Sequence, residues 1–261
     1  MKQNELAGKA AFISGGTGGV GLEAGIRLAR AGASVTVSGR TPERAEDALA
    51  RLKAVSDDVH FEAADSGDAG SIGAAVGRAA ARSGGALDIV ISAGAEGQPG
   101  AKPFAEMAPE EIQAAFNSRL YPRLFPVHAA IPALRVRGGS IVMLSTDAAR
   151  HPTPGESVMG AAGAAYILMT KVFAKEFARW QIRVNSVAMT LTSGTPSWDR
   201  IFSNKNFQQK LFAKAAERFP QGRPPTVDEV ADVVAFLISD EAGQINGQTV
   251  SVNGGLSFGG W

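Results

Sequence analysis

Short apolar runs and longer alanine-rich segments alternate along the chain. The short runs are rich in β-branched residues, as expected for strands that are buried on both faces of a parallel sheet. The alanine-rich segments have the length and the spacing of apolar positions that are typical of helices. Together the two patterns predict βαβ units. The predicted strands are Ala10–Ser14, Ser34–Val37, Val59–Glu62, Asp88–Ser92, Ser140–Leu144, Arg183–Val187 and Thr249–Val252.

Signals for helix starts fall between these strands. Thr41 is an N-cap residue that is followed by a proline in the first helical turn. Thr226 with Glu229 forms the pattern of a capping box ahead of another apolar run. We therefore predict an α/β fold in which residues 1–261 form a single Rossmann-type domain. Its doubly wound sheet has about seven parallel strands, with helices on both faces.

The segment at about 191–223 breaks the alternation and is predicted to be a small helical substrate flap. Between Trp198 and Arg223 it carries six basic residues against Asp199 and Glu217, and it is rich in phenylalanine. This composition suits an anionic, partly apolar ligand such as an acyl-CoA or an aromatic acid. An amphipathic flap with buried aromatic rings and solvated lysines gives the same pattern, so both interpretations stay open.

Composition narrows the classes of function. The chain has 26 basic and 25 acidic residues in 261, which gives no case for a nucleic-acid or membrane partner. It has no cysteine, which excludes disulfides and thiolate chemistry, and three scattered histidines, so we expect no metal site. The polar start Met1–Lys9 has no signal core, and no run approaches a membrane span. We expect a cytoplasmic protein.

The first predicted strand leads directly into a glycine-rich loop and then a helix. Glycines in such a loop allow a tight turn, a close approach of the backbone to a pyrophosphate, and close packing of helix on strand. The helix N-terminus then offers unpaired N–H groups to the phosphates. We therefore predict a dinucleotide site, with contacts from Gly15, Thr17, Gly19, Val20 and Gly21.

The end of the second strand bears on the choice of cofactor. An acidic residue there would bind the adenosine ribose, whereas Gly39 and Arg40 stand in this chain. An arginine can bind a 2′-phosphate, so NADP(H) is favoured over NAD(H). Asp65, after the third strand, is predicted either to accept a hydrogen bond from the adenine amine or to cap the helix near Ser71.

With these motifs the chain resembles the short-chain dehydrogenase/reductase family from about Leu6 to Trp261. Ser92-Ala93-Gly94 resembles the turn that follows the family's fourth strand, which implies that Ala93 and Gly94 contact the cofactor. Asn117 falls where the family has its active-site asparagine. The segments Ile182–Val187 and Asn246–Gly255 resemble the family's sixth strand and its C-terminal signature.

The resemblance also shows where this chain departs from the family's chemistry. The family uses a serine, a tyrosine thirteen residues later, and a lysine four residues after that. The corresponding residues here are Thr146, Met159 and Gly163. Thr146 keeps a hydroxyl group, whereas Met159 and Gly163 can neither donate nor accept a proton. Because the lysine also holds the nicotinamide ribose, cofactor binding is expected to be weakened or lost.

Other polar and ionisable residues lie near these positions in the sequence. Tyr166 lies seven residues after Met159, about 10 Å further along a helix axis, so we predict a packed or interface tyrosine. His151 and Glu156 lie in a loop at the carboxyl edge of the sheet and are candidate general acids. Exposed loop residues or subunit contacts would give the same sequence there. Asn117 is a candidate for holding a water molecule.

Three functions are consistent with this sequence. The first is a catalytically degenerate subunit of a hetero-oligomeric hydroxyacyl or ketoacyl dehydrogenase, with acyl-CoA as one candidate substrate and a Tyr/Lys-complete relative as partner. The second is an active, non-standard NADP(H)-dependent carbonyl or enoyl reductase that uses His151, Glu156 or water as the acid. The third is a non-catalytic dinucleotide-binding protein. In each case we expect a homo- or hetero-oligomer.

Overall fold

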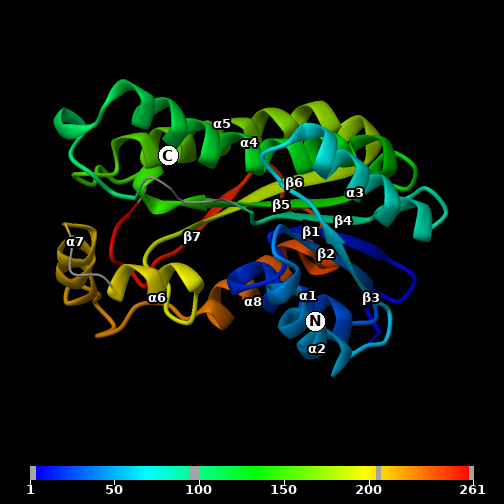
Figure 1. The fold of residues 1–261 in the computed structure, drawn as a ribbon. Coiled ribbons are helices and arrows are strands. Elements are labelled where there is room, and N and C mark those ends of the chain that lie inside the picture. Colours follow the sequence, from blue (N-terminus) through cyan, green and yellow to red (C-terminus); the bar gives the residue numbers. More distant parts are fainter. Residues whose placement is uncertain (1–3, 95–99, 204–206, 259–261) are drawn as a thin grey trace.

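A parallel sheet of seven strands forms the centre of the molecule (Figure 1). The computed structural model describes residues 4–94, 100–203 and 207–258. The strand order is β3-β2-β1-β4-β5-β6-β7, so the order reverses between β1 and β4. This arrangement confirms the predicted α/β doubly wound fold. The strands are β1 Ala10–Ser14, β2 Ser34–Gly39, β3 Val59–Ala63, β4 Ile89–Ser92, β5 Gly139–Thr146, β6 Ile182–Met189 and β7 Thr249–Val252.

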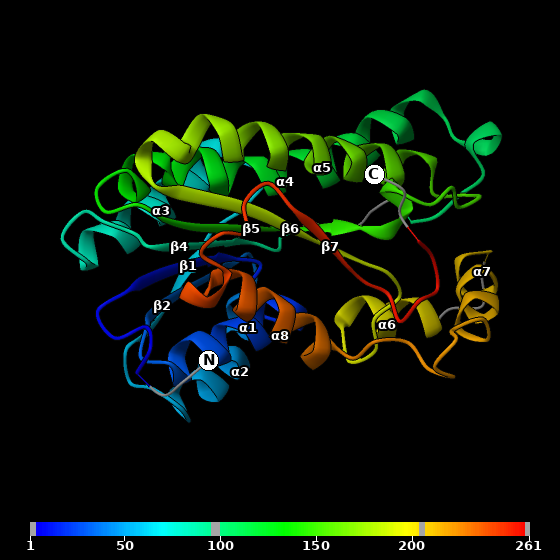
Figure 2. The ribbon, with the colours of Figure 1, turned by 180° about the vertical axis from the view of Figure 1, so that it is seen from behind.

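Helices cover both faces of the sheet. Helices α1, α2 and α8 lie on one face, and α3, α4 and α5 lie on the other (Figures 1 and 2). Two short helices, α6 and α7, lie beyond one edge of the sheet (Figure 1). The helices are α1 Gly19–Arg30, α2 Pro42–Lys53, α3 Ala69–Arg82, α4 Pro109–Leu134, α5 Ser157–Phe177, α6 Pro196–Phe202, α7 Phe207–Ala216 and α8 Val227–Ile238.

The sheet separates two apolar cores. Phe12 and Ile13 are neighbours in β1, yet Phe12 belongs to one buried cluster and Ile13 to the other, and neither is exposed to solvent. Successive side chains of a strand point to opposite faces, so each strand contributes to both cores. This explains why the strands are continuous apolar runs rather than alternating ones.

Strands β5 and β6 are longer than the sequence predicts. They pair along their whole length, from Gly139 opposite Ile182 to Thr146 opposite Met189. Backbone pairing with a neighbour holds residues in a strand whatever their own preference, and that neighbour is not visible in the local sequence. As a result, Thr146 and Met189 end their strands side by side at the carboxyl edge.

The predicted helix starts are present, with one difference. Thr226 accepts a hydrogen bond from the Glu229 amide at 3.2 Å, and the Glu229 carboxylate accepts one from the Thr226 amide at 2.8 Å. Thr41 precedes α2 as predicted, but its side chain makes no capping hydrogen bond. Helix α3 is capped by Asp68, which accepts from the Ser71 amide at 2.6 Å, and not by Asp65.

Helix α5 corrects one expectation. Among the described residues, Ser157–Trp180 is long and apolar enough to cross a membrane by length and composition. The prediction that no run approaches a membrane span was therefore wrong on that measure. One such helix is weak evidence for a span, because the core helix of a globular protein passes the same test. Here α5 packs against β5, β6 and α4.

Candidate functional site

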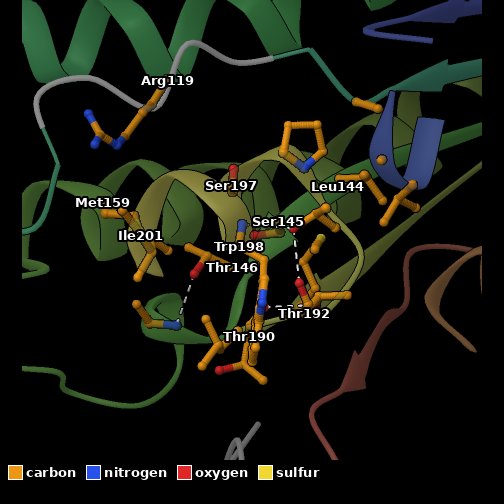
Figure 3. Close-up of a pocket in the computed structure, with 18 of the residues that line it drawn as sticks. Arg119, Leu144, Ser145, Thr146, Met159, Thr190, Thr192, Ser197, Trp198 and Ile201 are labelled. Carbon is orange, nitrogen blue, oxygen red and sulfur yellow. Dashed lines mark hydrogen bonds between the residues drawn. The ribbon is translucent and has the colours of Figure 1, made fainter. Parts of the chain in front are cut away.

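A cavity of about 730 Å³ opens at the carboxyl edge of the sheet. Residues at or after the ends of β1 to β6 line it, together with α6 and α7. Figure 3 shows Arg119, Met159 and Ile201 toward one end of the drawn cavity, and Leu144, Ser145 and Thr192 toward the other. Ligands of open α/β sheets bind at this edge, where the strand order reverses.

The glycine-rich loop after β1 is built for close backbone approach. Gly15 has φ +69°, and a Cβ atom there would lie 2.6 Å from the Gly94 Cα atom. A Cβ atom on Gly21 would collide with the Gly15 carbonyl oxygen. The structure thus brings the predicted residues of this loop together with Ala93 and Gly94 in one cavity wall. The predicted loop residues that line the cavity are Gly15, Thr17, Gly19, Val20 and Gly21.

Helix α1 begins at Gly19, and Gly18 before it provides no side-chain cap. The first N–H groups of a helix have no partner within it, so here they are available to a ligand. The partial positive charge of a helix N-terminus favours an anion at this place. The loop and the helix together therefore form a site for a pyrophosphate.

Two arginines line the cavity at the end of β2. Arg40 was predicted from the sequence, whereas Arg44, in the first turns of α2, was missed. Gly39 packs against Thr17 so closely that a Cβ atom would lie 2.7 Å from the Thr17 hydroxyl oxygen. Asp65 is exposed and lines the cavity, and its carboxylate accepts a hydrogen bond from the Gly67 amide at 2.8 Å.

Met159 and Gly163, at the positions where the resemblance implies a tyrosine and a lysine, lie on α5 where it meets β5. Thr146 and Met159 both line the cavity. The Thr146 hydroxyl accepts from the Ala148 amide at 3.3 Å. A Cβ atom on Gly163 would lie 2.6 Å from the Thr146 methyl carbon and 2.9 Å from the Ala149 Cβ atom. The helix thus approaches the strand so closely that a larger side chain at position 163 would displace its neighbours.

Glu156 is a buried carboxylic acid in the cavity wall. It is the residue just before α5, its side chain is buried, and it lines the cavity. Burial raises the pKa of the Glu156 carboxyl from 4.5 to about 7, although Arg119 and the Thr153 hydroxyl act in the opposite direction. At neutral pH this group can therefore both give and take a proton.

The other two predicted residues, His151 and Asn117, are exposed, so they are placed less favourably for proton transfer in the cavity. His151 lines the cavity, but its side chain is exposed. Asn117 is exposed on α4 and does not line the cavity, so its placement does not fit the predicted role. The role of Asn117 was inferred from the resemblance to the family. On a helix, a shift of the alignment by one position moves the side chain to a different face.

Asp147 is buried at the cavity wall and is held by several hydrogen bonds. Its carboxylate accepts from the Asn253 amide nitrogen at 2.9 Å and from the Ser257 hydroxyl. The Ser251 hydroxyl also donates to it, at 3.4 Å. These bonds tie the loop after β5 to the C-terminal segment after β7, which gives Asp147 a structural role at the rim.

Arg119 and Arg123 of α4 also line the cavity and were not predicted from the sequence. Tyr166 is buried, as predicted for a packed tyrosine, and part of it also lines the cavity. Burial raises the pKa of its hydroxyl to about 12. The four-residue spacing of the two arginines was an available signal, because such residues share one helix face.

The comparisons with known proteins agree with this geometry. Residues 15–257 match a family model described as enoyl-(acyl carrier protein) reductase. The chain belongs to the short-chain dehydrogenase/reductase family. A relative from Pseudomonas putida, 2,3-dihydroxy-2,3-dihydro-p-cumate dehydrogenase, is 32% identical over 97% of this chain and 96% of its own. The 2,3-dihydro-2,3-dihydroxybenzoate dehydrogenase of Bacillus subtilis is 28% identical over 99% and 100%.

Solved structures of the family have the same fold. Levodione reductase superposes with a TM-score of 0.87 at 25% identity, covering 96% of this chain and 98% of its own. A short-chain dehydrogenase from Burkholderia cenocepacia in complex with NADP gives a TM-score of 0.84 at 29% identity, covering 97% and 99%. The homologues are NAD(P)-dependent dehydrogenases and reductases, and members of the family are commonly homo-oligomers.

Proposed function

We propose that this chain is an NADP(H)-dependent oxidoreductase that interconverts an alcohol and a carbonyl group on an anionic organic substrate. Glu156 moves the proton. The observation that carries the proposal is the buried Glu156 carboxyl, which lines the cavity and has a pKa of about 7. A general acid or base works best when its pKa lies near the operating pH.

The residues present fit a dinucleotide. The Gly15 and Gly21 positions leave no room for a Cβ atom, and such a cradle admits a pyrophosphate against the backbone. Arg40 and Arg44 would bind the 2′-phosphate that distinguishes NADP(H) from NAD(H). When bound, the nicotinamide accepts or supplies the hydride. The missing lysine at position 163 removes one contact to the ribose and leaves these others.

The remaining chemistry belongs to two side chains at the edge of β5 and α5. The Thr146 hydroxyl can donate a hydrogen bond to the substrate oxygen and so orient it. Glu156, the N-cap residue of α5, and Met159, in the first turn of α5, both line the cavity. In oxidation the alcohol hydroxyl gives its proton to the Glu156 carboxylate. In reduction the protonated carboxyl returns it.

The test uses the isolated chain with NADP⁺ and 2,3-dihydro-2,3-dihydroxybenzoate, which is the substrate in the name of the Bacillus subtilis relative. Glu156→Gln is expected to lower kcat by about 100-fold, because general acid–base groups contribute on that order. Its NADP⁺ affinity should stay close to that of the wild type. His151→Ala, on the exposed rim, is the matched control and should keep its kcat. An unchanged kcat in Glu156→Gln would remove Glu156 from the mechanism.

A second candidate function is the degenerate subunit of a hetero-oligomer. The observation in its favour is the pair Met159 and Gly163, since the Gly163 position is packed against Thr146 with no space for a lysine stem. It requires that the isolated chain shows no turnover and that a Tyr/Lys-complete relative co-purifies from the host. Tight NADPH binding without turnover or partner would instead favour a non-catalytic dinucleotide-binding protein.

The proposal also covers the oligomeric state of the protein and its cellular compartment. We infer a cytoplasmic homo-oligomer, supported by the common assembly of the family's members. Light scattering of the purified chain gives its mass in solution. A monomer at micromolar concentration would contradict the homo-oligomer.

A further inference from the structure

The flap, at about 191–223, contributes positive charges to the cavity wall and, among its described residues, no negative ones. Lys214 of α7 and Arg218 in the turn after α7 both line the cavity, and so does Arg200 of α6. The two acidic residues of the flap, Asp199 and Glu217, are exposed and lie outside the cavity wall. The composition of the flap does not predict this separation of charges, which favours an anion in the cavity.

We call Lys214 and Arg218 the flap cation pair. Both residues are exposed, and neither side chain forms a hydrogen bond, an ion pair or a ring contact with the residues that the structure describes. Arg223, which lies outside the cavity wall, differs, because it donates to the two oxygens of the Glu229 carboxylate at 2.8 and 2.6 Å. A cation without a carboxylate partner can bind a ligand without first breaking an ion pair. The pair is therefore available to an anion that enters from solvent.

Contacts at both ends of α7 hold the flap cation pair at the cavity. At the start of the helix, the Phe207 ring packs on Gly155 so closely that a Cβ atom on Gly155 would lie 2.8 Å from a ring carbon. Further along, Phe212 packs against a small buried cluster that includes Ile201 and Phe219. This cluster is separate from the two cores beside the sheet. Packing thus sets the face that α7 turns to the cavity.

Apolar side chains line the cavity next to the flap cation pair. Leu211 and Ala215 lie four residues apart on α7, on either side of Lys214 in the sequence, so they share one helix face. Trp198 and Ile201 of α6 line the cavity as well (Figure 3). Ligand pockets are mostly apolar, with a few polar groups that fix the orientation of the ligand. A ligand that fits this wall has an apolar body that ends in an anionic group.

We propose that the flap cation pair binds the carboxylate of the substrate, and that the apolar body of this acid lies against α6 and α7. Lysine and arginine both form charge-assisted hydrogen bonds with carboxylate oxygens. The inference rests on the proposed function for the reaction, and it adds where the charge of the substrate lies. The carboxylate is at the flap, beyond the edge of the sheet, whereas Thr146 orients the reacting oxygen at the end of β5 (Figure 1).

The contact at the start of α7 also indicates the length of the substrate. Phe207 packs on Gly155, which directly precedes Glu156 in the chain. Lys214 lies seven residues after Phe207, about 10 Å further along the helix axis. The apolar body therefore spans on the order of 10 Å between the carboxylate and the end of the cavity where Glu156 exchanges a proton. An acid with a chain of medium length fits this span.

Calorimetric titration of octanoate and of octanamide into the full-length chain, with and without NADP⁺, tests this inference. The two probes have nearly the same shape, but only octanoate is charged. Octanoate should bind at least about fivefold more tightly, because an exposed ion pair contributes modestly to affinity. Lys214→Gln should weaken octanoate binding by about threefold, and the double variant Lys214→Gln, Arg218→Gln should remove the difference between the probes. Octanamide binding should not change in either variant.

Lys210→Gln is the matched control, because Lys210 is exposed on the same helix but does not line the cavity. It should leave octanoate binding unchanged. Equal losses in Lys210→Gln and Lys214→Gln would show a general effect of charge and overturn the inference. Equal affinities for the two probes, or no binding of octanoate, would overturn it too. Displacement of octanoate by NADP⁺ would place the carboxylate at the glycine-rich loop, with the same consequence.

The titration separates this inference from the proposed reaction, because it measures binding and not turnover. A chain that binds octanoate as expected but shows no activity contradicts the proposed function and leaves the role of the flap cation pair intact. A chain that is active but binds both probes equally does the reverse. Thermal unfolding of each variant shows whether it is folded.

Discussion

The buried carboxyl of Glu156 affects both the proposed chemistry and the stability of the fold. Its carboxyl group is buried before α5, and burial raises its pKa from 4.5 to about 7. The same desolvation that makes it a proton donor at neutral pH penalises its ionised form in the folded state. The residue is therefore expected to be neutral in a large part of the folded molecules at pH 7.

This pKa predicts a dependence of stability on pH. Below pH 4.5 the carboxyl is protonated in both states, and above pH 7 it is ionised in both, with a penalty in the folded one. Stability contributed by the raised pKa is therefore present at low pH and lost as the pH rises through 7. The loss is at most about 3 kcal/mol, from 1.36 kcal/mol for each pKa unit.

Chemical denaturation of wild type and Glu156→Gln at pH 5 and pH 8 measures it. The variant cannot ionise at this position, so its free energy of unfolding should fall less between the two pH values than that of the wild type. Identical changes in the two proteins would show that Glu156 has an ordinary pKa.

The two arginines at the end of β2 give a second prediction for single residues. Arg40 and Arg44 both line the cavity where the 2′-phosphate would lie. Replacing both with alanine should weaken NADPH binding by at least about tenfold, because charge-assisted hydrogen bonds to a phosphate are lost. NADH has no 2′-phosphate, so its affinity should not change. Fluorescence titration with both cofactors gives the two affinities, and a parallel loss for NADH would contradict the assignment.

Residues whose position depends on local sequence could be predicted, whereas residues whose position depends on the packing of helices could not. Gly15 and Gly21 were predicted because a tight loop between a strand and a helix is a local constraint. Arg119 and Arg123 were not, because the packing of α4 against α5 decides whether they face the cavity, the protein interior or solvent. Their spacing indicates a shared helix face, but not what that face meets.

At the scale of secondary-structure elements, strands and helix caps show the same contrast between features that local sequence sets and features that depend on other segments. The seven strands were predicted from their apolar runs, whereas the full length of β5 and β6 depends on the pairing between them. Helix α8 has both hydrogen bonds of its capping box, while Thr41 before α2 has no side-chain cap. The N-cap residue type was predicted in both cases, but its hydrogen bond depends on the local geometry.

The two threonines make a matched pair for a stability measurement. Thr226→Ala removes an observed capping hydrogen bond and should lower the free energy of unfolding by about 1 kcal/mol. Thr41→Ala removes a side chain without such a bond, so its effect should be less than half of that, within the few tenths expected at a surface position. Urea denaturation of both variants measures the two free energies. An equal loss in both would mean that the cap of α8 contributes nothing of its own.

At the scale of the whole molecule, the order of the strands assembles the site. Because the sheet order reverses between β1 and β4, the loops that follow these two strands meet, and Gly15 packs against Gly94. β5 and β6 continue the sheet on the β4 side, which brings Thr146 and Glu156 to the same cavity. The fold thus brings the glycine-rich loop, Thr146 and Glu156 into the wall of one cavity.

We propose that Glu156 transfers the proton, with Met159 and Gly163 at the positions where the family resemblance implies a tyrosine and a lysine. The most direct test is the pH profile of kcat for oxidation of 2,3-dihydro-2,3-dihydroxybenzoate by the isolated chain with NADP⁺. Oxidation needs the carboxylate form, so kcat should rise with pH through about 7 in the wild type, and Glu156→Gln should lack that rise. A wild-type profile that is flat between about pH 5 and 9, or one that Glu156→Gln reproduces, would contradict the account.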